Sequence, residues 1–140
     1  MLRDENETDA GPAPENPAEA QARKFQRELS AGLTSLVLLS VLADADGDLY
    51  GYEIAKRLST DALPTAPFKQ GALYPVLRNM SGAGLLSSRV VPSYSGPPRR
   101  YYRITALGRE VLAAWRDTWL TTRTFVDSVV QPMPAQEIPS

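Results

Sequence analysis

The chain of 140 residues contains no cysteine and no histidine. These two absences exclude disulfide bonds, thiolate nucleophiles, the commonest metal ligands and the usual general base of enzymes. Beyond residue 22 the aspartates and glutamates are scattered along the chain, which is typical of helix caps and solvated surface. The sequence therefore predicts no catalytic site, no metal site and no cofactor.

Long apolar runs are missing as well. Runs such as Leu36–Leu39 are far shorter than the roughly 20 apolar residues that a membrane-spanning helix needs. The chain does not open with a basic segment followed by an apolar one, which is the pattern of an export signal. We expect a cytoplasmic protein that has no membrane partner.

The formal net charge of −1 hides an uneven distribution. Residues 1–22 carry one arginine against six acidic residues, a net charge of −5. Residues 23–103 carry eleven basic residues against six acidic ones, a net charge of +5. A polyanion would bind to this basic middle part, although on charge alone a basic solvated surface explains it equally well.

The composition of the two ends predicts disorder. The opening "MLRDENETDAGPAPENPAEA" is rich in proline, glutamate and alanine, and the last ten residues hold three prolines. We predict a disordered acidic tail over residues 1–17 and a disordered tail over residues 131–140. The folded part is expected to be a domain over residues 18–104 followed by a long helix over residues 105–130.

A first helix is predicted over about residues 18–43. Its apolar stripe at helical spacing consists of Phe25, Leu29, Leu33, Leu36, Val37 and Ser40. Leu38, Leu39 and Val41 lie outside this stripe, so the helix must be covered on more than one side, by its own domain or by a second subunit. The turn "DADGDLY" then leads through a short extended piece into a second helix, "GYEIAKRLS".

The segment "FKQGALYPVLRNM", residues 68–80, predicts a third helix that starts near Gln70. Its apolar face consists of Leu73, Val76, Leu77 and Met80, and its opposite face of Gly71, Tyr74, Pro75, Arg78 and Asn79. Pro75 costs little because it lies within the first turn and a half. Tyrosine, arginine and asparagine beside a glycine favour a helix that fits into a groove.

The rest of the chain predicts a hairpin and a last helix. "LLSSRVVP" and "RRYYRIT" are typical of two strands joined by the loop "SYSGPP", and Thr105 is the predicted N-cap of the last helix. In that helix a seam with spacings of 3 and 4 is formed by Leu112, Trp115, Trp119, Thr122, Val126 and Val129. We predict a homodimer held by this seam together with the first helix, with Leu112, Trp115, Trp119, Val126 and Val129 as its contacts.

Helix, short strand, helix, turn, helix and two-stranded hairpin is the order of a winged helix-turn-helix. The predicted fold class is therefore mainly α with a small β-hairpin, a winged helix-turn-helix followed by a long C-terminal dimerisation helix. In this fold the third helix enters the major groove of DNA, and the hairpin, called the wing, follows the backbone or the minor groove.

Three segments resemble the PadR family of bacterial transcriptional regulators: "LYGYEIAKRL", "GALYPVLRNMSGAGLL" and "GPPRRYYRITALGREVL". They match, in one order and register over about residues 30–112, the Y-G-Y-E-I helix, the G-x-L-Y-P-x-L recognition helix and the wing of that family. The short region after the wing resembles the compact subfamily, in which one C-terminal helix forms the dimer. The chain departs from the family at Lys69-Gln70, where Ser-Pro is common, and in its acidic tail.

The face of the third helix and the resemblance together predict the DNA contacts. The candidates are Lys69, Gln70, Tyr74, Arg78 and Asn79 on or before the recognition helix, Arg99 and Arg100 on the wing, and Lys56 on the second helix. Neighbours on a strand point to opposite sides, so one of the two wing arginines should face away from the other. The alternative for Tyr74 is a ring packed on the wing, and for Lys56 a solvated surface.

Trp115 and Trp119 allow two interpretations. They pack in the dimer seam, or they line a site for a planar aromatic effector, as the resemblance implies, because some compact PadR members stack aromatic drugs between paired tryptophans across the dimer interface. Trp119 lies at the matching depth in the helix.

The expected function is a DNA-binding transcriptional regulator, a repressor that binds double-stranded DNA at an inverted repeat as a homodimer and is released by a small ligand. The alternative is a winged-helix module that binds another protein and does not read DNA. The basic wing and the exposed Tyr74 and Arg78 favour DNA, since such a module would show an acidic or apolar outer face.

Overall fold

The structure of the protein is a computed structural model that describes residues 16–45, 47–58 and 70–131. The chain divides into two compact units, residues 1–32 and residues 33–140. Helix α2 (Pro17–Asp44) belongs to both. The two predicted tails fall almost wholly outside the described residues, so their disorder stays a prediction.

In the first unit, α2 begins with a polar cap. The side-chain Oδ1 of Asn16 accepts a hydrogen bond from the backbone N–H of Glu19 at 2.8 Å, and Pro17 takes the first helical position, where no N–H is needed. Phe25 and Leu29 are exposed here, with 63% and 43% of their surface open to solvent. This part of α2 therefore presents apolar side chains that its own unit does not cover.

The buried face of α2 differs from the predicted stripe. The residues that it buries are Thr34, Leu38, Leu39 and Leu42. Leu38 and Leu39, which the sequence analysis placed outside the stripe, are fully buried. The stripe was wrong as a guide to the core because the helix is apolar around most of its girth between residues 33 and 43, so the spacing alone does not identify the core side.

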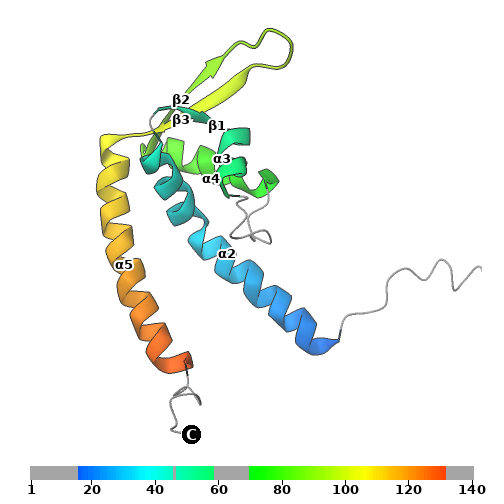
Figure 1. The fold of residues 1–140 in the computed structure, drawn as a ribbon, viewed down its shortest axis with the longest axis vertical. Coiled ribbons are helices and arrows are strands. Elements are labelled where there is room, and N and C mark those ends of the chain that lie inside the picture. Colours follow the sequence, from blue (N-terminus) through cyan, green and yellow to red (C-terminus); the bar gives the residue numbers. More distant parts are fainter. Residues whose placement is uncertain (1–15, 46, 59–69, 132–140) are drawn as a thin grey trace, which may run out of the picture. The chain divides into compact units, whose positions relative to one another are not determined.

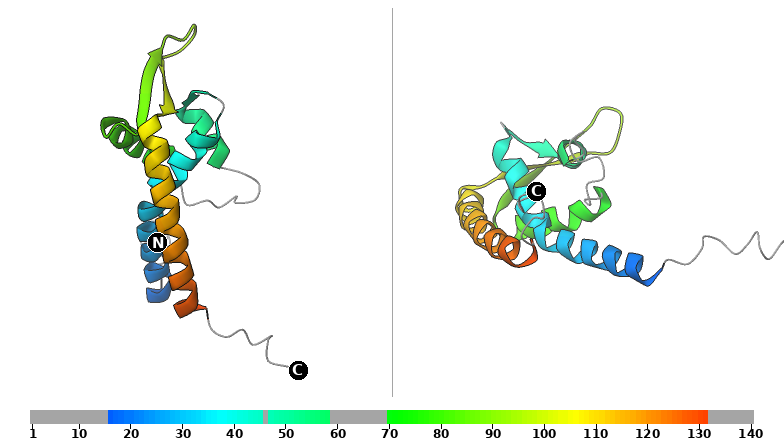
Figure 2. Two further views of the ribbon diagram at one scale, coloured as in Figure 1. Left: turned by 90° about the vertical axis from the view of Figure 1, so that its left-hand side faces the viewer. Right: turned by 60° about the horizontal axis from the view of Figure 1, so that its bottom comes forward.

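The second unit has the predicted order of elements. After α2 come β1 (Leu49–Tyr50), α3 (Gly51–Leu58), α4 (Gln70–Gly82), β2 (Leu86–Val91), β3 (Arg99–Ile104) and α5 (Ala106–Val130). The three strands form one antiparallel sheet in the order β1-β3-β2 (Figure 1). The fold class is confirmed, with one addition: β1 joins the predicted hairpin as a third strand. The hairpin projects as a narrow arm that ends in the loop between β2 and β3 (Figure 2).

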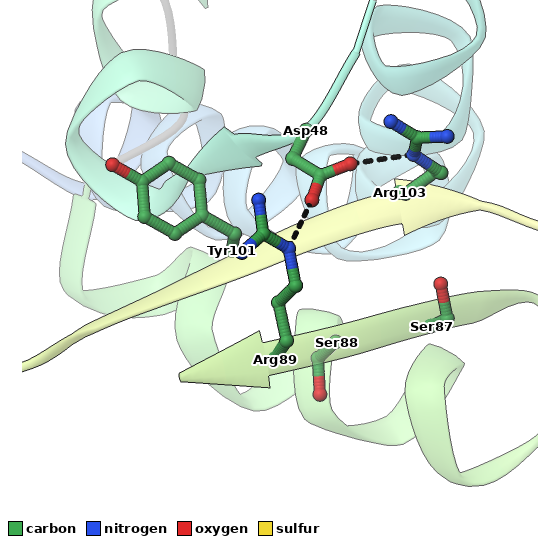
Figure 3. Close-up of a pocket in the computed structure, with 6 residues that line it drawn as sticks. All are labelled: Asp48, Ser87, Ser88, Arg89, Tyr101 and Arg103. Atoms are coloured by element: carbon green, nitrogen blue, oxygen red, sulfur yellow. Dashed lines mark hydrogen bonds and ion pairs between the residues drawn. The ribbon is translucent and has the colours of Figure 1, made fainter. Parts of the chain in front are cut away.

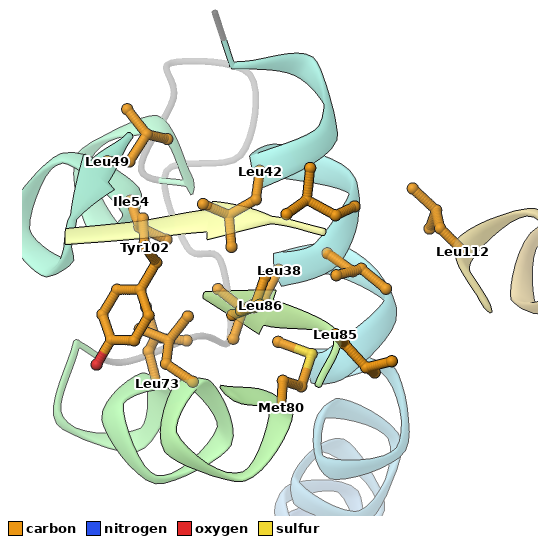
Figure 4. Packing of buried hydrophobic residues seen from close by; sticks show 13 residues of the cluster. Leu38, Leu42, Leu49, Ile54, Leu73, Met80, Leu85, Leu86, Tyr102 and Leu112 are labelled. Carbon is orange, nitrogen blue, oxygen red and sulfur yellow. The ribbon is translucent and has the colours of Figure 1, made fainter. Parts of the chain in front are cut away.

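A single hydrophobic core holds the second unit together. It is built from α2, all three strands, α3, α4 and the start of α5, and Figure 4 shows these side chains turned toward a common interior. Leu38, Leu42, Ile54 and Leu77 have at most 1% of their surface exposed. Helix α4 and the β2–β3 hairpin are therefore anchored on the same packed interior.

The end of α4 is fixed by a Schellman motif. The N–H of Leu85 donates to the carbonyl of Met80 at 2.9 Å and the N–H of Gly84 donates to the carbonyl of Ser81 at 3.1 Å. Gly84 has a φ of 84°, a conformation that suits glycine. The chain thereby turns directly from α4 into β2.

Thr105 caps α5, as predicted. Its Oγ1 accepts a hydrogen bond from the N–H of Gly108 at 2.9 Å and donates to the carbonyl of Gly84 at 2.7 Å. One hydroxyl thus joins the start of α5 to the turn that follows α4.

Two negative findings concern the described part of the chain. No helix there is both long and apolar enough to cross a membrane. Nor do acidic residues gather there in groups of three or more that could hold a metal ion.

Candidate nucleic-acid interface

Helix α4 has the two faces that the sequence predicts. Leu73, Leu77 and Met80 are buried with 2%, 0% and 4% of their surface exposed. Arg78 and Asn79 are exposed on the other side. The apolar residues therefore fix the helix on the core and leave a polar face open.

Pro75 is tolerated inside α4. Its ring removes one N–H from the helix and leaves the carbonyl of Gly71 without its usual partner. Both residues are exposed, so water can reach that carbonyl. The proline therefore sits where its cost is small.

Tyr74 is half-buried and lies against the first residue of α3. A Cβ placed at Gly51 would lie 2.4 Å from Cε1 of Tyr74 and 2.7 Å from its hydroxyl oxygen. A side chain at this position would therefore force the end of the Tyr74 ring to move. The ring of Tyr74 thus lies against α3. Its contact with DNA stays a prediction.

A hollow of about 380 Å³ lies beside Tyr74, and α3, α4 and the wing contribute to it. Its walls include Gly51 and Tyr52 of α3, Tyr74 and Arg78 of α4, and Arg99, Arg100 and Tyr102 of β3. Four predicted DNA contacts from two different elements, Tyr74 and Arg78 of α4 and Arg99 and Arg100 of β3, thus line the same hollow.

A neighbouring hollow of about 290 Å³ shares Arg78, Arg100 and Tyr102 and adds Ser81 and Ser88. Arg100 is held there by a hydrogen bond from its Nη1 to Oγ of Ser88 at 3.1 Å. Burial raises the pKa of the Tyr102 hydroxyl above its ordinary value, while the positive charges of Arg100 and Arg78 oppose the rise. Two guanidinium groups, one from α4 and one from the wing, therefore oppose the rise in the pKa of the same phenol.

The two wing arginines have different partners. Arg100 bonds Ser88 beside α4, whereas the guanidinium of Arg99 lies over the ring of Tyr50, 4.5 Å from its centroid. This difference agrees with the alternation of side chains along a strand.

The opposite face of the sheet holds a charged cluster that the sequence analysis missed. Asp48 accepts hydrogen bonds from Nε of Arg89 at 2.6 Å and from Nε of Arg103 (Figure 3). These two hydrogen bonds hold the pKa of Asp48 below its ordinary value of 3.8. The signal was present in the strand, because Arg99, Tyr101 and Arg103 alternate on one face of β3.

We expect the stabilisation that Asp48 provides to be lost in acid. A carboxyl group whose pKa is lowered by folding contributes stability that is complete above its unfolded pKa and is lost as the pH falls through its folded pKa. The difference in unfolding free energy between the wild type and Asp48→Asn should therefore be constant above about pH 5 and shrink below pH 3.8. Urea unfolding followed by circular dichroism between about pH 6 and pH 2.5 measures it, and a difference that does not change with pH would contradict it.

The remaining predicted DNA contacts are placed only in part. Lys56 is exposed on α3, and Gln70 is the first residue of α4. Lys69 lies outside the described residues.

The predicted seam of α5 is buried at its start and exposed toward its end. Leu112 is 2% exposed inside the core of this chain, and Trp115 packs against that core. Val126 and Val129 are 43% and 66% exposed. Leu112 therefore packs within this chain, whereas Val126 and Val129 are exposed to solvent.

Comparison with known proteins gives a consistent result. The model of the transcriptional regulator PadR-like family matches residues 38–114. A protein of Lysinibacillus sphaericus named Uncharacterized protein X is 28% identical over 95 residues, which cover 68% of this chain and 84% of that protein.

Solved structures show the same fold. The crystal structure of a PadR family transcriptional regulator from Eggerthella lenta DSM 2243 has a TM-score of 0.68 and 28% identity, over 82% of this chain and 96% of that one. The crystal structure of Bacillus subtilis PadR in complex with operator DNA has a TM-score of 0.53 and 19% identity, over 69% of this chain and 61% of that longer one. At that identity the second likeness concerns the fold alone.

Proposed function

Because the chain belongs to the PadR-like family of transcriptional regulators, we propose that it is a repressor that binds double-stranded DNA sequence-specifically. In this proposal α4 enters the major groove and the β2–β3 hairpin contacts the backbone or the minor groove. The main support is that Arg78 of α4 and Arg100 of the wing line the same two hollows beside the polar face of α4.

The residues of the interface take different roles in this proposal. Arg78 and Asn79, which are exposed on α4, reach base edges. The other candidates contact the phosphate backbone; they are Lys56, Lys69, Gln70, Arg99 and Arg100. Tyr74 shapes the floor of the hollow, since its ring is held against Gly51.

Repression at an inverted repeat needs a dimer, and we propose that α5 forms it with α5 of a second copy. The contacts are Trp115, Trp119, Val126 and Val129, which continue along the helix from Leu112. The exposed Phe25 and Leu29 of α2 offer a further apolar surface for a partner. Two recognition helices would then reach half-sites about 34–36 Å apart.

We also propose that a planar aromatic effector releases the repressor by stacking on Trp119, with Trp115 beside it. Trp119 is partly exposed in the protomer, so a ligand can reach it. Such a ligand weakens DNA binding only if it favours a different spacing of the two recognition helices.

We expect planar cationic dyes to quench the tryptophan fluorescence of the dimer and to lose this effect with Trp119→Ala. Ring stacking adds roughly 0.5–1.5 kcal/mol per pair, which corresponds to a loss of about two- to twelvefold in dye affinity. Titrations of the wild type, Trp119→Ala and Trp115→Phe measure it. Quenching that survives Trp119→Ala would move the effector site elsewhere.

Selection of bound sequences from random DNA, followed by affinity measurements at two salt concentrations, tests the proposed function. A repressor should enrich an inverted repeat and lose affinity steeply as the salt concentration rises, because phosphate contacts release counterions. Enrichment of no sequence, with weak binding that is insensitive to salt, would favour the protein-binding module.

Arg78→Ala and Arg99→Ala should differ in their effect on the selected operator. Arg78→Ala should weaken operator binding by about 1–3 kcal/mol and relax the sequence preference at one position. Arg99→Ala should weaken binding to all sequences similarly and lower the salt slope by about one unit. Fluorescence anisotropy with operator and scrambled DNA separates them, with Arg116→Ala on α5 as the control.

Arg78→Ala tests whether the exposed side of α4 faces the bases. Unchanged affinity and sequence preference in Arg78→Ala would show that the exposed side of α4 does not face the bases.

A further inference from the structure

The outer face of the sheet, opposite the core, carries an unusual set of arginines and tyrosines. Arg99, Tyr101 and Arg103 alternate on this face of β3, with Arg89 of β2 paired opposite Tyr101. Tyr50 of β1 is the partner of Tyr101 on the other edge. Three basic side chains of the hairpin, Arg89, Arg99 and Arg103, thus share a face with Tyr50 of β1.

Arg89 reaches across the central strand. The strand order β1-β3-β2 places β3 between Arg89 and Asp48, yet Nε of Arg89 lies 2.6 Å from Oδ2 of Asp48. On the way the guanidinium passes over the ring of Tyr101, 5.4 Å from its centroid. The side chain therefore ties β2 to the segment before β1 through a bridge over β3.

Asp48 is the point where this bridge and the central strand meet. Its second carboxylate oxygen accepts a hydrogen bond from Nε of Arg103. The Asp48 side chain is only 12% exposed, whereas the two arginines are 63% and 62% exposed. One carboxylate thus holds both strands of the hairpin.

Tyr50 holds the far part of β3 in a similar way. Its ring lies under the guanidinium of Arg99 at 4.5 Å and meets the ring of Tyr101 at 5.3 Å between centroids. The contact restrains the first residue of β3, beyond the two residue pairs that join β1 to β3.

We propose that Asp48 and Tyr50 form a clamp that sets the position of the wing relative to α4. Asp48 acts by holding Arg89 and Arg103 of the two hairpin strands, and Tyr50 acts on DNA binding through Arg99. The backbone ladder between β1 and β3 is only two residue pairs long, so the side chains carry much of the connection. This role rests on the proposed DNA binding, in which Arg99 contacts phosphate. Asp48 and Tyr50 are positioning residues: Asp48 orients Arg89 and Arg103, and Tyr50 orients Arg99.

The first experiment tests the clamp without DNA. Amide hydrogen exchange of the full chain is compared for the wild type, Asp48→Asn, Tyr50→Leu and Tyr50→Phe. The amides of residues 86–104 should exchange faster in Asp48→Asn and Tyr50→Leu, while those of α4 keep their wild-type rates. Unchanged rates in the hairpin, or an equal increase throughout the chain, would overturn the clamp.

The second experiment tests the effect on DNA by a double-mutant cycle with the selected operator. Tyr50→Leu is used here because it changes no charge. Asp48→Asn removes a negative charge and would thereby add a long-range attraction to DNA. Tyr50→Leu should weaken binding by about two- to fivefold, the amount that corresponds to one exposed cation–π contact. In an Arg99→Gln background the same substitution should have almost no effect, and Tyr50→Phe should recover most of the affinity that Tyr50→Leu loses.

The outcomes separate this inference from the function on which it rests. A loss that persists in the Arg99→Gln background would show that Tyr50 acts through general destabilisation, and would overturn its positioning role. If the wild type binds no DNA, the proposed function fails, and the exchange rates alone then decide whether the clamp exists.

Discussion

Gly108→Ala should destabilise the protein more than any other exchange of glycine for alanine in α4 or α5. A Cβ at this position would lie 2.2 Å from the carbonyl oxygen of Leu85 and 2.7 Å from Cγ1 of Ile104. Overpacking of a well-packed site costs typically 1–3 kcal/mol. We expect a loss near the upper end of that range, about 3 kcal/mol, because the nearer atom belongs to the backbone.

The carbonyl of Leu85 cannot easily move away. It accepts a hydrogen bond from the N–H of Thr105 at 3.0 Å, and the N–H of Leu85 is bound to the carbonyl of Met80 at 2.9 Å. The new methyl group would instead displace the first turn of α5. That turn holds the cap formed by Thr105, so the hydrogen bond from Gly108 to its hydroxyl would be strained as well.

Urea unfolding followed by far-ultraviolet circular dichroism measures this loss. Gly82→Ala is the matched control, because a Cβ at Gly82 would meet no atom within 4 Å. The control should be neutral or slightly stabilising, since alanine is a better helix former than glycine by about 1 kcal/mol. An unfolding free energy of Gly108→Ala equal to that of the control would contradict the close approach of α5 to Leu85.

The elements of the fold follow from local sequence patterns, and these are short-range. The predicted start of α4 near Gln70, the cap at Thr105 and the two strands of the hairpin are confirmed. Each depends on spacing or on a single capping side chain. The fold class follows from their order, because a helix-turn-helix followed by a hairpin has few alternative arrangements.

The contacts between elements were less accessible to prediction. Whether Leu38 or Leu36 of α2 faces the core depends on what packs against the helix, because apolar residues surround it. Tyr74 lies against Gly51 because of a close approach between α3 and α4, which are more than ten residues apart in sequence. The pairing of Asp48 with Arg89 requires the strand order β1-β3-β2, which the sequence pattern does not contain.

The parts of the candidate site that depend on a single helix or strand could be predicted from the sequence. The exposed Arg78 and Asn79 follow from the helical wheel of α4 alone. The different partners of Arg99 and Arg100 follow from strand alternation. That Arg100 and Arg78 line the same hollow needs the tertiary structure, since the two side chains come from elements that only the core brings together.

The double variant Val126→Asp with Val129→Asp should convert the proposed dimer into a folded monomer. Both side chains are exposed in the protomer, so aspartates there should leave its core intact. In a dimer seam four carboxylates would lose their water, which costs several kcal/mol for each unpaired buried charge. The dimer is therefore expected to dissociate while the helical content stays unchanged.

The effect on DNA should be large as well. A dimer binds its second half-site intramolecularly, and the loss of such a link lowers the affinity by about 10²–10⁴-fold. We expect this loss on an intact inverted repeat and almost none on a single half-site, because the recognition helix and the wing are unaltered.

Leu120→Asp is the control for a charge on the same helix. Leu120 is 55% exposed and points about 100° away from Trp119, because successive residues of a helix are rotated by that angle. It should leave both the dimer and the DNA affinity unchanged. Sedimentation velocity at micromolar concentration, together with anisotropy on the full and half operators, measures these expectations. A wild type that sediments as a monomer, or a double variant that remains dimeric, would show that the exposed part of α5 is not the dimer contact, and the proposed spacing of the two recognition helices would then fail with it.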